Sequence, residues 1–433
     1  MRFQVTELCE VLGGALVGPA VAEVEGLATD SRLVAPRQLF AALRAERDGH
    51  DFVAGAVEAG AAAALVERPV EGVASIVVPD VRAALVTLAG HARDRLTGRV
   101  VGITGSVGKT TTKDLLASVL SQRFVTAASE KSFNNELGVP LTLCNAPDDV
   151  EAVVVEMGAR GAGHIAFLCG MARPDIGVVT TVQAVHTELM GGVEQIAVAK
   201  GELVESLPAS GLAVLNAAVP LVAAMASRTS ARVVTFGQGG DVVAEGVTVD
   251  EQLRAAFDLR SPWGSTPVHL GVRGVHNVDN ALAAAAVGLF CGVALDEVAA
   301  GLASGEQSPW RMDLGTTATG ARVLNDAYNA APASMTAALQ SLAALPADRR
   351  TAVLGVMAEL GDLAPEEHRR IAELAAGLDI RVIAVDTDLY GVEPVNGVQG
   401  ALEQLGSLDE GDAVLVKASR VAGLERVAAA LVG

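Results

Sequence analysis

The chain has 433 residues, 51% of them hydrophobic, and its 32 Lys and Arg against 51 Asp and Glu give a formal net charge of −19. This hydrophobic content excludes intrinsic disorder as the main state, and the acidic excess argues against binding of nucleic acid through bulk charge. At roughly 100–200 residues per domain, the length predicts two to four domains. Aromatic residues make up only 3%, so small aliphatic side chains must fill the interior, as in Ala- and Val-rich α/β enzymes.

No sequence feature points to export or to a membrane. The four cysteines show no Cys-x-x-Cys spacing, which predicts reduced, buried thiols rather than a disulfide framework. The N-terminal segment lacks the basic and apolar regions of a signal peptide. The longest uncharged apolar stretch, Ala281 to Leu295, is shorter than the roughly 20 residues that a membrane span needs. We therefore expect a cytoplasmic protein without membrane insertion, in which this stretch is a buried helix.

The chain divides into three blocks. Residues 1–97 contain short strand-like and helix-like pieces around a turn-rich stretch, which predicts a small mixed α/β domain. From Arg99, and again from about Gly320, apolar runs of strand length alternate with segments of helical length. This alternation predicts parallel βαβ units whose strands are buried on both faces. We expect a mostly parallel central domain over residues 98–307, a Rossmann-like C-terminal domain over 308–433, and a hinge at Ser304 to Arg311.

The strongest chemical signal is the segment Val101 to Thr112, VGITGSVGKTTT, in which an apolar strand is followed by a glycine-containing turn, Lys-Thr and a helix. Such a loop points backbone N–H groups at phosphate oxygens, and the helix N-terminus adds a favourable dipole. The segment departs from the strict G-x-x-x-x-G-K-[ST] template because Ile103 occupies the place of the first glycine. Its working core predicts binding of ATP through these residues: Gly105, Ser106, Gly108, Lys109, Thr110 and Thr111.

Bound ATP in so acidic a chain needs Mg²⁺ and local positive charge rather than an overall field. Glu156 ends an apolar strand, where ligands of open α/β sheets bind, and Thr110 follows the loop lysine, so both are candidate Mg²⁺ ligands. His186 follows the next strand and is a further candidate, although a lone histidine is more often structural. Lys200 lies in an apolar helical segment; a buried lysine can take up CO₂ as a carbamate, but an exposed helical lysine is the simpler interpretation.

With these residues in place, the chain resembles a known family, the ATP-dependent Mur ligases of peptidoglycan precursor synthesis. Each motif alone is weak, but their order and spacing along nearly the whole chain are specific. The matching segments are Asp30-Ser31-Arg32, Asp48 to Phe52, Gly105 to Thr112, Asn134 to Pro140, Glu156 to Ala159, His186, Ala199-Lys200, Gly274 to Asn277 with Asn280, Arg311-Met312, Asp326 to Asn329, and Val353 to Gly361.

Other residues distinguish the branches of this family from one another. Tripeptide-forming relatives usually carry Glu-Val-Ser-Ser where this chain has Glu156 to Ala159, and the Asp-Asn-Pro-Arg motif of the diaminopimelate-adding ones is missing. Folylpolyglutamate synthases usually read Gly-Lys-Gly-Ser where this chain has Gly108 to Thr111. The resemblance therefore implies the dipeptide-adding branch, which joins D-alanyl-D-alanine to UDP-N-acetylmuramoyl-tripeptide through an acyl phosphate. It further implies a cytoplasmic enzyme, and we expect a monomer.

The resemblance implies a role for each matched residue. Lys109, His186 and Lys200 would serve catalysis, and Lys200 matches a lysine that several members carbamylate. The remaining roles fall into three groups: Thr110, Glu156, His186 and Lys200 at Mg²⁺; Asn277, Asn280, Arg311 and Asp326 at ATP with the loop; and Ser31, Arg32, Asn134, Asn135, Tyr328 and Asn329 at the substrate.

Three departures from the family pattern predict altered affinity or substrate detail rather than loss of activity. Val107 stands where a polar residue is common, Ala217-Ala218 where two acidic residues are common, and Ala331 where a second Asn is usual. Two alternatives remain open at this point. One is another amino-acid-adding Mur ligase; the other is a phosphate-loop NTPase that acts as a switch, which gives no reason for the segments around Arg32 and Tyr328.

Overall fold

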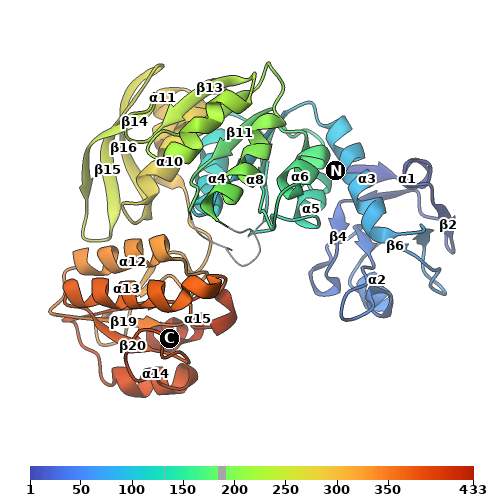
Figure 1. The fold of residues 1–433 in the computed structure, drawn as a ribbon. Helices are drawn as coiled ribbons and strands as arrows, with labels where there is room; N and C mark the ends of the chain where they lie inside the picture. Colours follow the sequence, from blue (N-terminus) through green and yellow to red (C-terminus); the bar gives the residue numbers. More distant parts are fainter. Residues whose placement is uncertain (131, 184–191) are drawn as a thin grey trace.

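The N-terminal part of the chain, in a computed structural model that describes residues 1–130, 132–183 and 192–433, forms a five-stranded sheet of order β2-β7-β6-β5-β4. Strands β4 to β7 run parallel, β2 pairs antiparallel with β7, and β1 forms a separate antiparallel pair with β3 (Figure 1). The elements are β1 (Arg2–Gln4), α1 (Val5–Leu12), β2 (Ala15–Val17), β3 (Glu23–Glu25), β4 (Leu27–Ala28), η1 (Ser31–Leu33), β5 (Leu39–Ala41), η2 (Gly49–Phe52), α2 (Val53–Glu58), β6 (Ala63–Val66), β7 (Ser75–Val77) and α3 (Val81–Arg95).

The central part is built on a six-stranded parallel sheet of order β13-β12-β11-β8-β10-β9. The apolar runs predicted as strands form it because they are buried throughout, except for the exposed first residue of β8. Its elements are β8 (Arg99–Thr104), α4 (Lys109–Leu120), β9 (Thr126–Ala128), α5 (Gly138–Cys144), β10 (Ala152–Glu156), α6 (His164–Ala172), β11 (Ile176–Val179), α8 (Val193–Glu205), β12 (Leu212–Asn216), α9 (Pro220–Ala223), η3 (Ala224–Arg228), β13 (Arg232–Phe236), β14 (Val243–Val249), β15 (Arg254–Ser261), β16 (Gly264–Arg273), α10 (Asn277–Phe290) and α11 (Leu295–Ser304).

Two features of the central part differ from the sequence prediction. Strands β14, β15 and β16 form a separate antiparallel sheet that the sequence did not indicate, because its outer residues are polar and its apolar runs are short. The apolar stretch from Ala281 to Leu295 is not one helix. Helix α10 ends at Phe290 and α11 begins at Leu295, and between them Gly292 has φ +90°, a left-handed conformation that ends the first helix.

The C-terminal part has a five-stranded sheet of order β17-β18-β21-β19-β20, parallel except for the edge strand β17. Its elements are β17 (Asp313–Thr316), β18 (Arg322–Asn325), α12 (Pro332–Ala344), β19 (Arg349–Leu354), η4 (Gly361–Leu363), α13 (Ala364–Gly377), β20 (Arg381–Ala384), α14 (Gly397–Leu405), β21 (Asp412–Lys417), η5 (Arg420–Ala422) and α15 (Glu425–Val432). The predicted α/β fold with several domains and a large parallel sheet is thereby confirmed.

The N-terminal sheet and the central sheet share one apolar core. Leu85 and Leu88 of α3 belong to the same buried cluster as Val139 and Leu143 of α5. At this junction the side-chain amide of Asn145 accepts from the backbone N–H of Leu27 and donates to its C=O, both at 2.9 Å. The domain boundary predicted at residue 97 stays a prediction. The sheet before it and the sheet after it share this core.

The C-terminal part is attached by the segment after α11, which has no regular structure between Ser304 and β17. Ser308 in this segment donates through its backbone N–H and its hydroxyl to Asp114 of α4, at 3.2 and 2.7 Å. A second attachment comes from the turn between β14 and β15, where buried Leu253 packs into the C-terminal core with Met312 and Met335. The linker predicted as a hinge therefore lies against the central part, and the boundary at residue 307 stays a prediction.

All four cysteines are free; Cys144 and Cys169 are buried, and Cys9 and Cys291 are half-buried. In the described ranges, the structure has no helix of the length and apolar character needed to cross a membrane.

Candidate active site

The phosphate-loop candidate joins β8 to α4 and is held by the end of β11. Ser106 N–H donates to the C=O of Thr181 (2.9 Å) and Val107 N–H donates to the Thr181 hydroxyl (3.1 Å). The Thr180 hydroxyl in turn donates to the C=O of Val107 (2.6 Å). The loop backbone around Val107 is thus fixed without a polar side chain at that position, which accounts for one departure from the family pattern.

Glycine is required at two loop positions. Gly105 has φ +153°, and a Cβ there would lie 1.9 Å from Thr180 Oγ1; Gly108 has φ +87°, and a Cβ would lie 2.4 Å from Asn280 Oδ1. Substituents at either position collide with their neighbours, in conformations that side chains rarely adopt.

We therefore expect Gly105→Ala to lower the free energy of unfolding by about 1–3 kcal/mol, because the loop must move away from β11. Urea denaturation, followed by circular dichroism, measures this change in the free energy of unfolding. The control is Gly90→Ala in helix α3, where nothing lies within 4 Å of the new methyl group. That control is expected to raise stability by about 0.5–1 kcal/mol through the higher helix propensity of alanine. Equal stability of Gly105→Ala and the unaltered chain would contradict this account of the loop.

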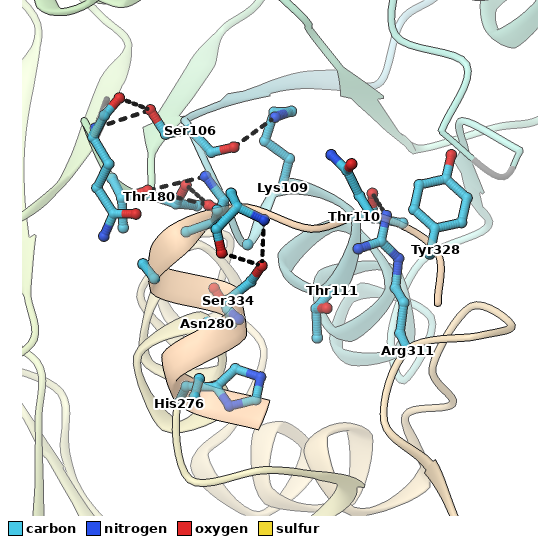
Figure 2. A pocket seen from close by; sticks show the side chains of 18 of the residues that line it. Ser106, Lys109, Thr110, Thr111, Thr180, His276, Asn280, Arg311, Tyr328 and Ser334 are labelled. Atoms are coloured by element: carbon cyan, nitrogen blue, oxygen red, sulfur yellow. Dashed lines mark hydrogen bonds between the residues drawn. The ribbon is translucent and has the colours of Figure 1, made fainter. Parts of the chain in front are cut away.

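The loop lysine folds back onto its own loop. Lys109 Nζ donates to the C=O groups of Gly105 (2.8 Å) and Ser106 (3.4 Å), as Figure 2 shows for the side chain above the loop. Burial lowers the pKa of Lys109 from its ordinary value, and the positive charge of Arg311 lowers it further, whereas the negative charge of Glu156 raises it. An anion held by the loop would replace these carbonyl partners and favour the charged ammonium form.

Thr110 and Glu156 meet at the carboxyl edge of the central sheet. The Thr110 hydroxyl donates to Glu156 Oε2 (2.9 Å) and lies 3.2 Å from the hydroxyl of Ser132. Asn134 donates from Nδ2 to the other carboxylate oxygen of Glu156 (2.8 Å). Glu156 itself is 1% exposed, so its charge faces this cluster of polar groups rather than water. The described residues contain no group of three or more His, Cys, Asp or Glu side chains around a metal position, and Glu156 is accompanied by hydroxyl groups instead.

Arg311 brings the linker to the same place. Its Nη2 atom donates to Thr110 Oγ1 (3.1 Å) and to Ser132 Oγ (3.4 Å), and its guanidinium carbon lies 4.1 Å from the centre of the Tyr328 ring. Stacking on an aromatic face is a favourable arrangement for a guanidinium group. Figure 2 shows Arg311 and Tyr328 beside Thr110. Two residues from the C-terminal side of the chain therefore complete the polar cluster around Thr110.

Asn277 and Asn280 lie at the start of α10 and line the cavity. Asn280 Nδ2 donates to Asn277 Oδ1 (2.7 Å), Asn277 Nδ2 donates to the C=O of Arg273 (2.6 Å), and Asn280 Oδ1 accepts from the Thr112 hydroxyl (3.1 Å). Asn280 thus holds α4 through Thr112 as well as lining the cavity. Contact with adenine stays a prediction for both residues.

Asp326, Tyr328 and Asn329 follow strand β18. Asp326 Oδ1 accepts from the backbone N–H of Met312 (3.1 Å), and its other oxygen is paired with the ammonium group of Lys417. Asn329 Oδ1 accepts from the N–H of Ala330 (2.9 Å). These side chains form the C-terminal wall of the cavity.

One cavity of about 550 Å³ unites these groups between the central and C-terminal parts. The predicted site residues that line it are Ser106, Gly108, Lys109, Thr110, Thr111, Asn134, Glu156, Asn277, Asn280, Arg311, Asp326, Tyr328 and Asn329. Most of the predicted nucleotide site and part of the predicted substrate site therefore share one space.

Several predicted residues lie elsewhere. Gly105 lies behind the loop against Thr180. Ser31 and Arg32 lie in η1 of the N-terminal sheet, where the largely exposed Arg32 is paired with Asp30 at 2.6 Å. Asn135 Oδ1 accepts from the N–H groups of Leu137 and Gly138, at the start of α5.

Lys200 lies in helix α8, away from the cavity lining. Lys200 is 3% exposed in helix α8, so the interpretation as an exposed helical lysine is wrong. It does not line the cavity described above. Burial lowers the pKa of Lys200 well below its ordinary value, and the positive charge of Lys109 lowers it further. His186 lies outside the described residues, and its predicted place near the metal stays a prediction.

The sequence analysis missed Ser132, Ser334 and Lys417, which also line the cavity. Lys417 had a usable signal, because it ends an apolar buried strand as Glu156 does. Ser334 explains the third departure from the family pattern. Its hydroxyl accepts from the N–H of Ala331 (3.0 Å) and donates to its C=O (2.9 Å), so the start of α12 is closed without an Asn at position 331.

Comparison with known proteins agrees with this geometry. Three family models match the chain: the Mur ligase family catalytic domain over residues 23–93, the Mur ligase middle domain over 103–288, and the Mur ligase glutamate ligase domain over 310–420. A relative from Mycobacterium bovis named UDP-N-acetylmuramoyl-tripeptide–D-alanyl-D-alanine ligase is 42% identical, over 100% of this chain and 98% of its own. The relative of the same name from Escherichia coli is 36% identical over 98% and 97%.

Solved structures agree as well. A MurF structure from Acinetobacter baumannii matches with a TM-score of 0.89 and 31% identity, over 100% of this chain and 99% of that one. A MurF ligase from Thermotoga maritima in complex with ADP matches with a TM-score of 0.81 and 29% identity, over 94% and 96%. The chain belongs to the Mur ligase family, which confirms the predicted resemblance. Its prediction as an ATP-dependent amide-bond-forming enzyme is confirmed with it.

Proposed function

We propose that the protein joins D-alanyl-D-alanine to UDP-N-acetylmuramoyl-tripeptide, coupled to cleavage of ATP to ADP and phosphate. The observation that carries this proposal is the single cavity in which Lys109, the Thr110–Glu156 pair and Arg311 face one another. Its relatives of 36–42% identity bear the name of this activity, and a MurF neighbour was solved with ADP. A switch-like NTPase would not need a cavity closed by the C-terminal part of the chain, and the family match disfavours it.

The chemistry requires activation of a carboxylate, which is a poor acylating agent. A terminal carboxylate oxygen of the tripeptide attacks the γ-phosphorus of ATP, and ADP leaves with the electrons of the broken P–O bond. The amine of D-alanyl-D-alanine then attacks the acyl carbon, and phosphate leaves from the tetrahedral intermediate with the former carboxylate oxygen, while the amine loses a proton. Lys109 and Arg311 would neutralise the charge on the transferring phosphoryl group, and the loop would hold the chain of phosphates in line.

The polar cluster at Thr110 fits Mg²⁺. This ion prefers hard oxygen ligands, and the Thr110 and Ser132 hydroxyl groups and the Glu156 carboxylate supply such oxygens within one hydrogen-bonded group. When bound, Mg²⁺ would offset the negative charge of the ATP phosphates. His186 is the further ligand proposed from the sequence. Both oxygens of the Glu156 carboxylate accept from this cluster, one from Thr110 and the other from Asn134.

The long muramoyl substrate would extend from the N-terminal sheet to the cavity. Ser31 and Arg32 would bind its UDP end, because they lie in η1 of the N-terminal part. Figure 1 shows this part at the opposite end of the central part from the C-terminal part. Asn134, Tyr328 and Asn329 line the cavity where the peptide end would react.

A phosphate-release assay with a panel of acceptors tests the choice of acceptor. With muramoyl tripeptide and ATP present, D-alanyl-D-alanine should release phosphate and single amino acids should not. If a single amino acid is used faster than the dipeptide, the chain is another amino-acid-adding Mur ligase.

We further propose that Lys200 carries a carbamate. A neutral amine attacks CO₂, so the lowered pKa of this buried lysine increases the reactive fraction at neutral pH, and the N–C bond forms with loss of a proton. Lys200→Met is expected to lower the ligation rate by about 10²-fold, by loss of a positioned anionic group. Lys200→Arg, which keeps a positive charge but cannot form the carbamate, should be equally impaired. Native mass spectrometry in bicarbonate should show the added mass of one CO₂. An unmodified amine in a fully active sample would contradict the proposal.

A further inference from the structure

A second buried lysine lies in the cavity wall, and the reaction scheme leaves it unused. Lys417 is the last residue of β21, is 2% exposed and lines the same cavity as Lys109. Burial of an ammonium group costs free energy unless its charge is paired and its hydrogens are bonded. The partners of Lys417 therefore identify what this side chain holds in place.

All three hydrogens of the ammonium group have acceptors in one short segment. Lys417 Nζ donates to Asp326 Oδ2 (2.5 Å), to the C=O of Asn329 (2.9 Å) and to the C=O of Asp326 (3.3 Å). An ammonium group has three donors, so this set uses its full capacity. The lysine thus fixes both the carboxylate of Asp326 and the path of the backbone as far as Asn329.

The same carboxylate holds the linker. Asp326 Oδ1 accepts from Met312 N–H (3.1 Å), and Tyr328 N–H donates to the C=O of Trp310 (3.1 Å). Trp310 and Met312 both have positive φ, +61° and +54°, which costs free energy for residues other than glycine. These two strained residues flank Arg311, so the contacts with the segment after β18 keep Arg311 directed at Thr110.

We propose that Lys417 is a positioning residue for the adenosine nucleotide. It holds the Asp326 carboxylate in the orientation that accepts from ribose hydroxyl groups, and through Asp326 and Met312 it holds Arg311 against the loop. This inference rests on the proposed function, because it takes ATP as the ligand of the cavity and Asp326 as a ribose acceptor.

Titration calorimetry of the full chain with ADP tests it, in Lys417→Met, Asp326→Asn and the double variant. We expect each single variant to weaken ADP binding by about 10-fold or more, because a charge-assisted contact and its orientation are lost. Because Lys417 acts through Asp326, the double variant should bind no more than about 3-fold weaker than Asp326→Asn alone. The KM for ATP should rise, and the KM for the muramoyl substrate should stay unchanged.

Arg349→Met is the matched control, since it breaks the ion pair with Asp412 at the opposite end of β21. It should leave the dissociation constant of ADP unchanged. If Lys417→Met does not fold, Lys417→Gln, which keeps a donor without the charge, takes its place with the same expected loss.

Two results would overturn the inference alone: a folded Lys417 variant that binds ADP as tightly as the unaltered chain, or losses that multiply in the double variant. Failure of the unaltered chain to bind ADP would contradict the proposed function, and the inference with it.

Discussion

Lys109→Ala should abolish ligation while leaving the fold intact. The ammonium group is the loop's only side-chain cation, and it would neutralise charge that develops on the transferring phosphoryl group. We expect the rate of ADP formation in the presence of both substrates to fall by at least about 10³-fold, the upper range for loss of one preorganised electrostatic contact. Because Lys109 bonds only carbonyl groups of its own loop, the circular dichroism spectrum should not change.

The control for this variant is Arg123→Ala, which removes an exposed cation just beyond the far end of α4. Its activity should equal that of the unaltered chain. If Lys109→Ala still forms the amide with ATP, the loop lysine does not have the role assigned to it.

Glu156→Gln should give the second largest loss of ligation activity. The substitution keeps the size of the side chain and removes the one charge in the Thr110 cluster that attracts a divalent cation. We expect ligation to fall by about 10²-fold or more, and the Mg²⁺ concentration needed for half-maximal rate to rise, since loss of metal-based charge stabilisation is worth several kcal/mol. Titration of the initial rate with MgCl₂ measures both effects.

Strand β10 offers a matched control for this second variant. Glu151 lies just before the opposite end of that strand and accepts from the N–H of Val125. Glu151→Gln should therefore leave the Mg²⁺ dependence unchanged. An unchanged Mg²⁺ requirement in Glu156→Gln would exclude this carboxylate as a metal ligand.

The sequence predicted those parts of the fold that depend on local pattern. Runs such as Ala152–Glu156 are buried along their whole length, and their continuous apolar character indicated parallel strands directly. The antiparallel strands β14 to β16 gave no such signal, because most residues of β14 are exposed and its apolar positions are interrupted by Glu245 and Gly246. The break between α10 and α11 depends on the left-handed conformation of Gly292, which an alanine-rich apolar stretch concealed.

The candidate site also has residues that local sequence patterns predicted and contacts that they did not. Lys109, Thr110 and Glu156 could be found because each stands at a strand end or a helix start in its own sequence context. The contact of Arg311 with Thr110 spans 201 positions, and that of Lys417 with Asp326 spans 91, so no local pattern contains either contact. Lysine is rare in this chain, with five among its 32 basic residues, and only those at 109 and 200 were singled out from the sequence.

The structure also explains how so acidic a chain could bind anionic substrates. ATP and the UDP-linked tripeptide are both anionic, yet the chain carries a net charge of −19. Lys109 and Arg311 lie at one cavity, where low solvent access strengthens their interactions with phosphate. Local placement of these cations, together with bound Mg²⁺, would suffice to hold ATP.

The most direct test of the central claim is mass spectrometry of the product formed from UDP-N-acetylmuramoyl-tripeptide, ATP and D-alanyl-D-alanine, with ¹⁸O in the terminal carboxylate of the tripeptide. The account predicts a product that contains the intact dipeptide, in an amount equal to the ADP formed, and one ¹⁸O atom in the released phosphate. ADP formation without an amide product, or phosphate free of the label, would contradict it.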